Sequence, residues 1–335
     1  MEKARRVRLK ISYDGNDISA DLAPFLKAFD YNDVMSGEAD DMSITLEDME
    51  ELWEGDWLPE KGAVLNASLI TDGWRGGGEE ELPLGTFEID EIEITGPPHE
   101  VKLKAVSVPD DNNLRAVERS KSWEKTKLSV VASDVAAGAS MSLLYDVPDD
   151  PELDRAEQTE ESDLAFLMRL CKDQGLALKI AEKQIIIFDE EKYEQQEPVL
   201  TLSKSGGLVK SYSIRSKTRD TYSACRVKYK ESGKGEAIEY TYKQEGKKGG
   251  KTLQVNQQVK DLAEAEKLAK KKLREKNKEE ISLSATCMGD IRLAASNTVM
   301  LEGFHKFDGK YIITKAGHSV GSGYSVSLEM RRCLV

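Results

Sequence analysis

The chain has 335 residues, of which 39% are hydrophobic and 33% are charged. This composition predicts two or three domains with packed cores and excludes wholesale disorder. No run reaches the roughly 18 apolar residues of a membrane-spanning helix. No hydrophobic run follows the first basic residues either, so we expect neither a membrane anchor nor a secretory signal. The four cysteines are too scattered for a disulfide framework, which indicates synthesis in a reducing cytoplasm.

The net charge of −13 conceals a division along the chain. Residues 1–205 carry 22 basic and 46 acidic side chains, a balance of −24, whereas residues 206–335 carry 26 basic and 15 acidic side chains, a balance of +11. Most of the chain would therefore repel a nucleic acid, which argues against a simple nucleic-acid binder. The division predicts two surfaces that face different partners.

Residues 1–108 are expected to form an N-terminal β-barrel domain. Apolar residues alternate with polar ones in several short segments, the pattern of half-buried strands. Turn signals such as Asp14-Gly15 and Gly96-Pro97-Pro98 separate these segments. A change of phase at Asp90-Glu91 predicts a β-bulge. The expected strands lie near residues 7–13, 42–46, 63–70, 84–94 and 101–105.

Residues 109–200 are expected to form a small α+β insertion. Trp123 and residues 128–138 suit a short helix that Gly138 ends, and a second helix is expected to begin after Ser162 and to end at Gly175. Two strands should follow, at residues 176–180 and 184–188, around a tight turn.

Residues 201–335 are expected to form a C-terminal β-barrel domain that one helix interrupts. That helix should span residues 261–278, with Asp261 as its cap and with Leu262, Ala265, Ala269 and Leu273 as its apolar stripe. Asp308-Gly309 is the strongest short hairpin signal of the chain. The basic turn at residues 246–251 is expected to be mobile.

Metal, cofactor and nucleophile sites find no support in the sequence. The three histidines, His99, His305 and His318, are scattered, and neither Cys-x-x-Cys nor His-Glu-x-x-His spacing occurs. We therefore expect no metal and no cofactor. Cys171, Cys225, Cys287 and Cys333 lie among apolar residues and are interpreted as small buried hydrophobes.

The sequence does not support an enzyme active site either. Residues 73–78 are rich in glycine, but three glutamates follow them and would repel a phosphate, so a hairpin loop is the better interpretation. Acidic clusters such as residues 47–51 are too numerous for any one pair of carboxylates to indicate a glycosidase. Trp53 and Trp57 could line a sugar groove, although packing on a barrel is the better interpretation. We expect no catalytic residues and no enzymatic activity.

The lysine-rich helix at residues 261–278 raises the question of a nucleic-acid or acidic partner. It lacks interleaved aromatic residues, and nearby glutamates partly balance its charge. A solvated helix that packs through one apolar stripe is the favoured interpretation.

The order of these pieces resembles the phage late control protein D family, the hub proteins of contractile-tail baseplates. Each motif is weak alone, and their order over nearly the whole chain carries the resemblance. The helix at residues 263–274 is one of these pieces. The matching segments are residues 84–90 (Leu-Gly-Thr-Phe-Glu-Ile-Asp), Gly96-Pro97-Pro98, residues 289–293 (Gly-Asp-Ile-Arg-Leu), residues 299–304 (Val-Met-Leu-Glu-Gly-Phe), residues 308–313 (Asp-Gly-Lys-Tyr-Ile-Ile), His318 and residues 323–330 (Gly-Tyr-Ser-Val-Ser-Leu-Glu-Met).

The resemblance implies a structural protein with two tail-tube-like β-barrel domains per subunit. Three copies would form a ring that adapts a sixfold tail tube to a threefold central spike. The implied partners are the spike, the tube, the tape-measure protein and other baseplate proteins, without specific nucleic-acid binding or membrane insertion. The protein would be made in a bacterial cytoplasm and built into a phage tail or a tail-like particle such as a tailocin.

Under this interpretation the acidic residues of the N-terminal region are expected to face the channel or the hub exterior, and the basic C-terminal region to meet an acidic neighbour. Two alternatives stay open: a hub or tail-associated protein of a non-contractile tail, and an all-β glycosidase that degrades peptidoglycan.

Overall fold

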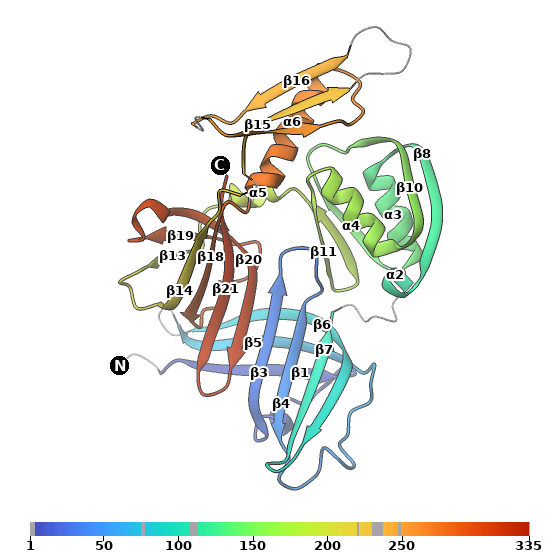
Figure 1. The fold of residues 1–335 in the computed structure, drawn as a ribbon. Coiled ribbons are helices and arrows are strands. Elements are labelled where there is room, and N and C mark those ends of the chain that lie inside the picture. The colour runs from blue at the N-terminus through green and yellow to red at the C-terminus, as the bar shows by residue number, and fades with distance from the viewer. Residues whose placement is uncertain are drawn as a thin grey trace.

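The protein is mainly β, as the sequence predicts, with few helices (Figure 1). The structure, a computed structural model, describes residues 4–74, 78–107, 113–219, 221–229, 237–246 and 249–334. In the described part of the chain, no helix is long and apolar enough to cross a membrane. Parts of two expected loops, residues 75–77 and residues 247–248, lie outside the described residues, and so does the N-terminal tripeptide.

Five of the N-terminal strands lie where the alternation predicts them, whereas the strand at Leu26–Val34 was not expected. Phe29, Ile44, Leu69 and Phe87 are buried in one core. The bulge is confirmed, because the register between β6 and β7 shifts after Ile89. A short helix, α1 (Ser19–Leu22), covers one end. The strands are β1 (Arg6–Tyr13), β2 (Asn16–Asp17), β3 (Leu26–Val34), β4 (Asp41–Glu47), β5 (Val64–Trp74), β6 (Gly78–Thr95) and β7 (Glu100–Val106).

The inserted segment has its own core and contains both expected helices. The hydroxyl of Ser162 accepts a hydrogen bond from the backbone N–H of Ala165 at 3.3 Å, the expected cap. Trp123, expected in a helix, lies on a strand instead, where its ring stacks on Phe166 at 5.1 Å between centroids. The elements are α2 (Asn113–Ala116), β8 (Glu118–Lys127), α3 (Leu128–Gly138), β9 (Ser142–Asp146), β10 (Glu152–Ser162), α4 (Asp163–Asp173), β11 (Ala177–Ala181), β12 (Gln184–Phe188) and α5 (Glu190–Glu194).

The C-terminal β-region packs around a further core that includes Leu283, Val299, Tyr311 and Leu328. Asp308-Gly309 does not form a two-residue hairpin. It ends the 3₁₀ turn η1 (His305–Phe307), so that the loop between β19 and β20 is longer than the dipeptide predicts. The strands are β13 (Leu200–Ser203), β14 (Val209–Ser216), β18 (Ile281–Met288), β19 (Thr298–Glu302), β20 (Gly309–Val320) and β21 (Tyr324–Arg332).

A small sheet within this region carries α6 (Leu262–Asn277) on one face. Its strands are β15 (Tyr222–Tyr229), β16 (Ile238–Lys243) and β17 (Lys251–Val255). Asp261 caps α6 as expected, and its carboxylate accepts from the N–H of Glu264 at 2.8 Å. Leu262 is 59% exposed and does not belong to the stripe, because it stands at the first helical position, clear of the sheet. The stripe ends instead in the buried amide of Asn277.

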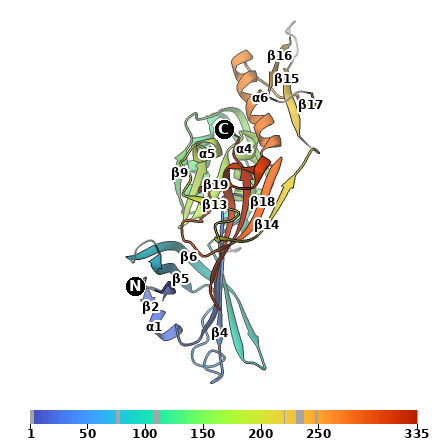
Figure 2. The ribbon, with the colours of Figure 1, turned by 90° about the vertical axis from the view of Figure 1, so that its left-hand side faces the viewer.

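The two β-regions are parts of one sheet of 13 strands. Along its main path the order is β14-β18-β21-β20-β3-β4-β7-β6-β5-β1-β2, while β13 and β19 branch off β20. The join is β20, which pairs with β19 near its start and with β3 from Lys315 to Val320. The ladder of the described strands is therefore open and continuous rather than two closed barrels. In both views the N-terminal half lies at the bottom and α6 at the top, with the C-terminal strands between them (Figures 1 and 2).

Candidate functional site: a charged junction

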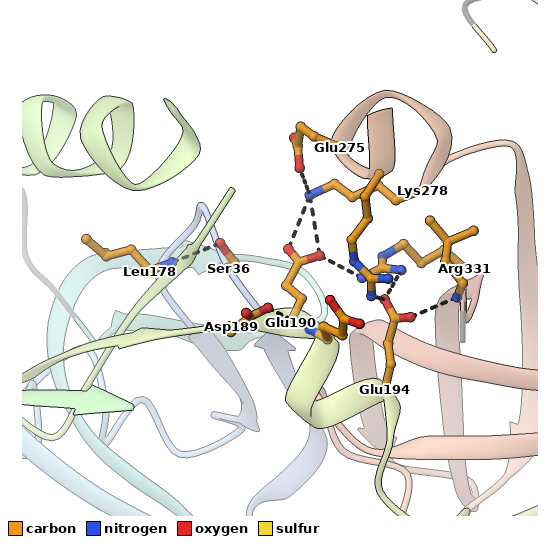
Figure 3. Close-up of polar contacts among 11 residues, drawn as sticks. Ser36, Leu178, Asp189, Glu190, Glu194, Glu275, Lys278 and Arg331 are labelled. Atoms are coloured by element: carbon orange, nitrogen blue, oxygen red, sulfur yellow. Dashed lines mark hydrogen bonds and ion pairs between the residues drawn. The ribbon is translucent and has the colours of Figure 1, made fainter. Parts of the chain in front are cut away.

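Segments from three parts of the chain meet in a buried cluster of charges beside α5 (Figure 3). At its centre is Arg331 on β21, whose side chain is 1% exposed. Its Nη1 lies 2.5 Å from Oε1 of Glu194, and its Nη2 lies 2.6 Å from Oε2 of Glu190. We call this cluster, with the basic side chains of α6 that join it, the charged junction.

The last turns of α6 add the remaining charges. Nζ of Lys278 lies 3.2 Å from Glu190 and 2.8 Å from Glu275, and Nη2 of Arg274 lies 2.7 Å from Glu194. Glu190 and Glu194 are four residues apart, and so are Arg274 and Lys278. Residues at this spacing lie on the same face of a helix, so the two carboxylates can face the two cations. The three cations and three carboxylates of the charged junction balance.

Burial and charge pairing act against each other in the charged junction. Burial tends to lower the pKa of Arg331, but Glu190 and Glu194 overcome this and hold the pKa above its ordinary value. Burial likewise tends to raise the pKa of Glu190, but Arg331 and Lys278 lower it. Both groups are therefore charged at neutral pH, and each depends on the other for its stability in the interior.

A second ionic contact joins the inserted segment to the N-terminal strands. Nζ of Lys179 on β11 lies 2.5 Å from Asp33 and 3.1 Å from Asp40. The second oxygen of Asp33 accepts from the N–H of Ala295 at 2.7 Å, so that one carboxylate connects all three regions. Burial raises the pKa of Asp40 to about 6, although Lys179 pulls it down, while Asp33 and Asp40 outweigh burial and raise the pKa of Lys179.

An aromatic contact joins the two halves of the large sheet. The indole N–H of Trp74 donates to the carbonyl of Gly289 at 2.9 Å, and the Trp74 ring lies 6.1 Å from the Tyr324 ring between centroids. Within the C-terminal half, Nδ1 of His318 lies 2.7 Å from the hydroxyl of Tyr324. A Cβ at Gly289 would lie 2.0 Å from the Tyr324 ring, so only glycine fits there. Burial lowers the pKa of His318 to about 4, which keeps the ring neutral at pH 7.

Lysines near and on α6 face acidic residues of the inserted segment. Lys260 lies 3.0 Å from Glu152, and Lys267 lies 3.2 Å from Asp149. Each pair is exposed and contributes little alone. Together they show that part of the opposite charge of the two chain regions is compensated inside one subunit.

The other residues considered in the sequence stay apart. His99 lies 3.5 Å from Glu54, His305 begins η1, and His318 is buried at the sheet junction. All four cysteines are buried and free, and burial raises the pKa of Cys171 and of Cys333 to about 12. Among the described residues, no three His, Cys, Asp or Glu side chains form a group that could hold a metal ion. Among the described residues, the charged junction, the Lys179 contact and the Trp74–Gly289 contact hold distant segments of the chain together.

Sequence reasoning missed the charged junction. The spacing of Glu190 with Glu194, and of Arg274 with Lys278, was a readable signal of two charged helix faces. Their common partner Arg331 lies more than fifty residues from either pair, and no local pattern connects them.

Comparison with known proteins gives a family and a fold. The model of the family described as phage tail baseplate hub (GPD) matches residues 89–324. No curated protein matches the chain by sequence.

Several solved structures share the fold. The tail protein from Neisseria meningitidis MC58 has a TM-score of 0.71 at 15% identity, covering 97% of this chain and 96% of that chain. The 43 kDa tail protein of prophage MuSo2 from Shewanella oneidensis has a TM-score of 0.71 at 15% identity, covering 98% of each chain. An E. coli type VI secretion component, described as similar to the T4 bacteriophage tail proteins gp27 and gp5, has a TM-score of 0.56 at 12% identity, covering 98% of this chain and 76% of that chain. At these identities the likeness concerns the fold alone.

Proposed function

Because the chain belongs to the phage tail baseplate hub (GPD) family, a family of structural baseplate proteins, we propose that it forms a trimeric hub ring. The ring adapts a sixfold tail tube to a threefold central spike in a contractile phage tail or a tail-like particle. Membership of the family makes the chain a baseplate hub protein. The trimeric ring and its role as an adaptor between tube and spike are what we propose.

The observation that carries the proposal is the composition of the large sheet. Apart from the two-residue β2, each half contributes six strands to this sheet: β1 and β3 to β7 in the N-terminal half, and β13, β14 and β18 to β21 in the C-terminal half. Two comparable halves per subunit give six in a trimer, the number that a sixfold tube can match. We assign the halves to two tube-like domains, residues 1–108 and residues 201–335, with residues 109–200 as the insertion.

The sheet edges support assembly into a ring. Among the described strands β14 pairs only with β18, and β1 pairs only with β5 apart from the two residues that pair with β2. Edges of this kind can pair with a neighbouring subunit. The proposed tube-like barrel would then close through such neighbours.

The three interior contacts suit an adaptor. The charged junction, the Lys179 contact and the Trp74–Gly289 contact fix the two halves, the insertion and α6 relative to one another. A ring that passes force between a tube and a spike requires subunits of fixed shape.

The proposed partners are the central spike, the tail tube, the tape-measure protein and other baseplate proteins. A solved Francisella structure of similar fold is described as a PdpA–VgrG complex, with a TM-score of 0.58 at 8% identity, covering 98% of this chain and 58% of that chain. Within the ring we assign the surplus acidic side chains of residues 1–205 to the channel or the outer surface, where they would repel phosphates. A basic channel in the assembled ring would contradict that assignment.

Imaging of assembled particles tests the proposal. A particle that carries a tagged copy of the chain should show threefold density at the tail tip, between the tube and the spike. Density that follows the length of the tube, or a particle complete without the chain, would contradict it.

A further inference from the structure

An apolar groove lies on the N-terminal half, away from the charged junction. It is formed by α1, β1 and the segment between β4 and β5, and its volume is about 570 Å³. We call it the tryptophan groove, lined by Tyr13, Ile18, Leu22, Trp53, Trp57 and Leu58. In Figure 1 this segment follows β4 at the lower end of the molecule, on the side opposite α6.

The segment that forms the groove is held in one shape. The buried carboxylate of Asp48 accepts from the N–H of Trp53 and from the N–H of Glu54, both at 3.1 Å. The hydroxyl of Tyr13 accepts from the N–H of Glu60 at 3.1 Å. A surface ordered before binding loses less entropy when a partner arrives.

Aromatic and apolar side chains are exposed along the groove. Trp57 is 44% exposed and Leu58 46% exposed, beside a cluster in which Trp57 lies 5.5 Å from Trp53 and 5.8 Å from Phe25 between ring centroids. The indole N–H of Trp53, a residue 7% exposed, has no hydrogen-bond partner among the described residues. Clustered tryptophans of this kind are typical of the energetic centre of a protein interface.

The segment that forms one wall of the groove is strongly acidic. Between Glu47 and Glu60 the chain carries seven acidic side chains and no lysine or arginine, and all of these acids except Asp48 are exposed. Asp21 and Asp56 lie at the groove itself. An apolar floor beside an acidic wall is complementary to an apolar side chain that basic residues flank.

We propose that the tryptophan groove binds a basic peptide segment of another protein, which inserts one aliphatic or aromatic anchor and places lysine or arginine on the acidic wall. A second copy of this chain is the competing occupant, which the self-association measurement below distinguishes. A sugar is a poorer occupant, because the Trp53 and Trp57 rings meet edge to face at 87° and offer no broad platform. The inference goes beyond the hub proposal and does not depend on the ring.

A displayed library of random dodecapeptides, selected on the full chain, tests the inference. Enriched peptides should combine an aliphatic or aromatic residue with flanking lysine or arginine, and their affinity should fall as salt rises. Leu58→Ser should weaken the best of them by about tenfold or more. Leu144→Ser is the matched control, because Leu144 is also 46% exposed but lies on β9, and it should leave the affinity unchanged.

Several results would overturn the inference. Enriched peptides that bind Leu58→Ser as well as the unaltered chain would show mere attraction of opposite charges. Self-association of the chain that Leu58→Ser abolishes would assign the groove to a second copy, and binding of soluble peptidoglycan fragments that Trp57→Ala abolishes would assign it to a saccharide. Folding of each variant is checked by its circular dichroism spectrum and unfolding midpoint.

Discussion

Removing Arg331 tests whether the charged junction stabilises the subunit. Arg331→Met keeps much of the apolar length of the side chain but leaves Glu190 and Glu194 without their buried partner. Breaking a buried ion pair from one side costs about 3–5 kcal/mol. Because Lys278 and Arg274 still contact these carboxylates, we expect a loss near the lower end, about 3 kcal/mol of unfolding free energy.

Urea unfolding followed by tryptophan fluorescence measures the effect, with the linear dependence on urea giving the free energy. The matched control is Arg226→Met, which breaks an Arg–Glu pair of 2.7 Å on the surface, where both side chains are 40% exposed. Solvent screens that pair, and we expect no measurable change.

A rescue variant separates loss of charge pairing from loss of packing. Replacing Glu190 alone by glutamine in the Arg331→Met background leaves two cations and two carboxylates, with Lys278 on Glu275 and Arg274 on Glu194, and should recover part of the lost stability. If Arg331→Met behaves like the surface control, or if the glutamine variant recovers nothing, the reasoning about the charged junction is refuted.

The remaining predictions concern the junction of the sheet halves and the Lys179 contact. Burial holds the pKa of His318 at about 4, below its ordinary 6.5. The stabilising contribution of the neutral ring is therefore complete above pH 6.5. As the pH falls from 6.5 to 4, the free energy of unfolding should decrease by about 3 kcal/mol. Asp40, with its pKa raised to about 6, contributes most below pH 3.8 and loses its contribution as the pH rises through 6, so the two effects oppose each other. The stability difference between the unaltered chain and His318→Gln, measured from pH 4 to pH 7, isolates the histidine; a difference that does not vary with pH would refute its role. Gly289→Ala should cost about 1–3 kcal/mol because its Cβ meets the Tyr324 ring, whereas Gly138→Ala, with nothing within 4 Å, is the control for thermal unfolding and should show no such loss.

Local patterns in the sequence predicted the helices α3, α4 and α6 and many of the strands, but not the strands β3, β8 and β10. Alternation of apolar and polar residues predicted strands because one face of each strand is buried. Ser162 and Asp261 marked the starts of helices because their side chains accept hydrogen bonds from backbone N–H groups that have no partner within the helix. These features depend on neighbours a few residues away. They could therefore be read from one sequence.

Long-range pairing could not be read in this way. Nothing in residues 315–320 specifies β3 as their neighbour, so the expectation of two separate barrels missed the continuous sheet. The same limit hid the partners of Arg331, since charged residues are common and the sequence does not indicate which of them become buried. Trp123 was misplaced because a tryptophan packs equally well on a helix or a strand, and here its contact with Phe166 decided the outcome.

The oligomeric mass in solution, measured by sedimentation with and without the spike protein of the same particle, tests the central claim most directly. We expect three copies of the chain in one complex, and a stable complex of that trimer with the spike. A chain that stays monomeric and does not bind the spike protein would contradict the proposed hub ring.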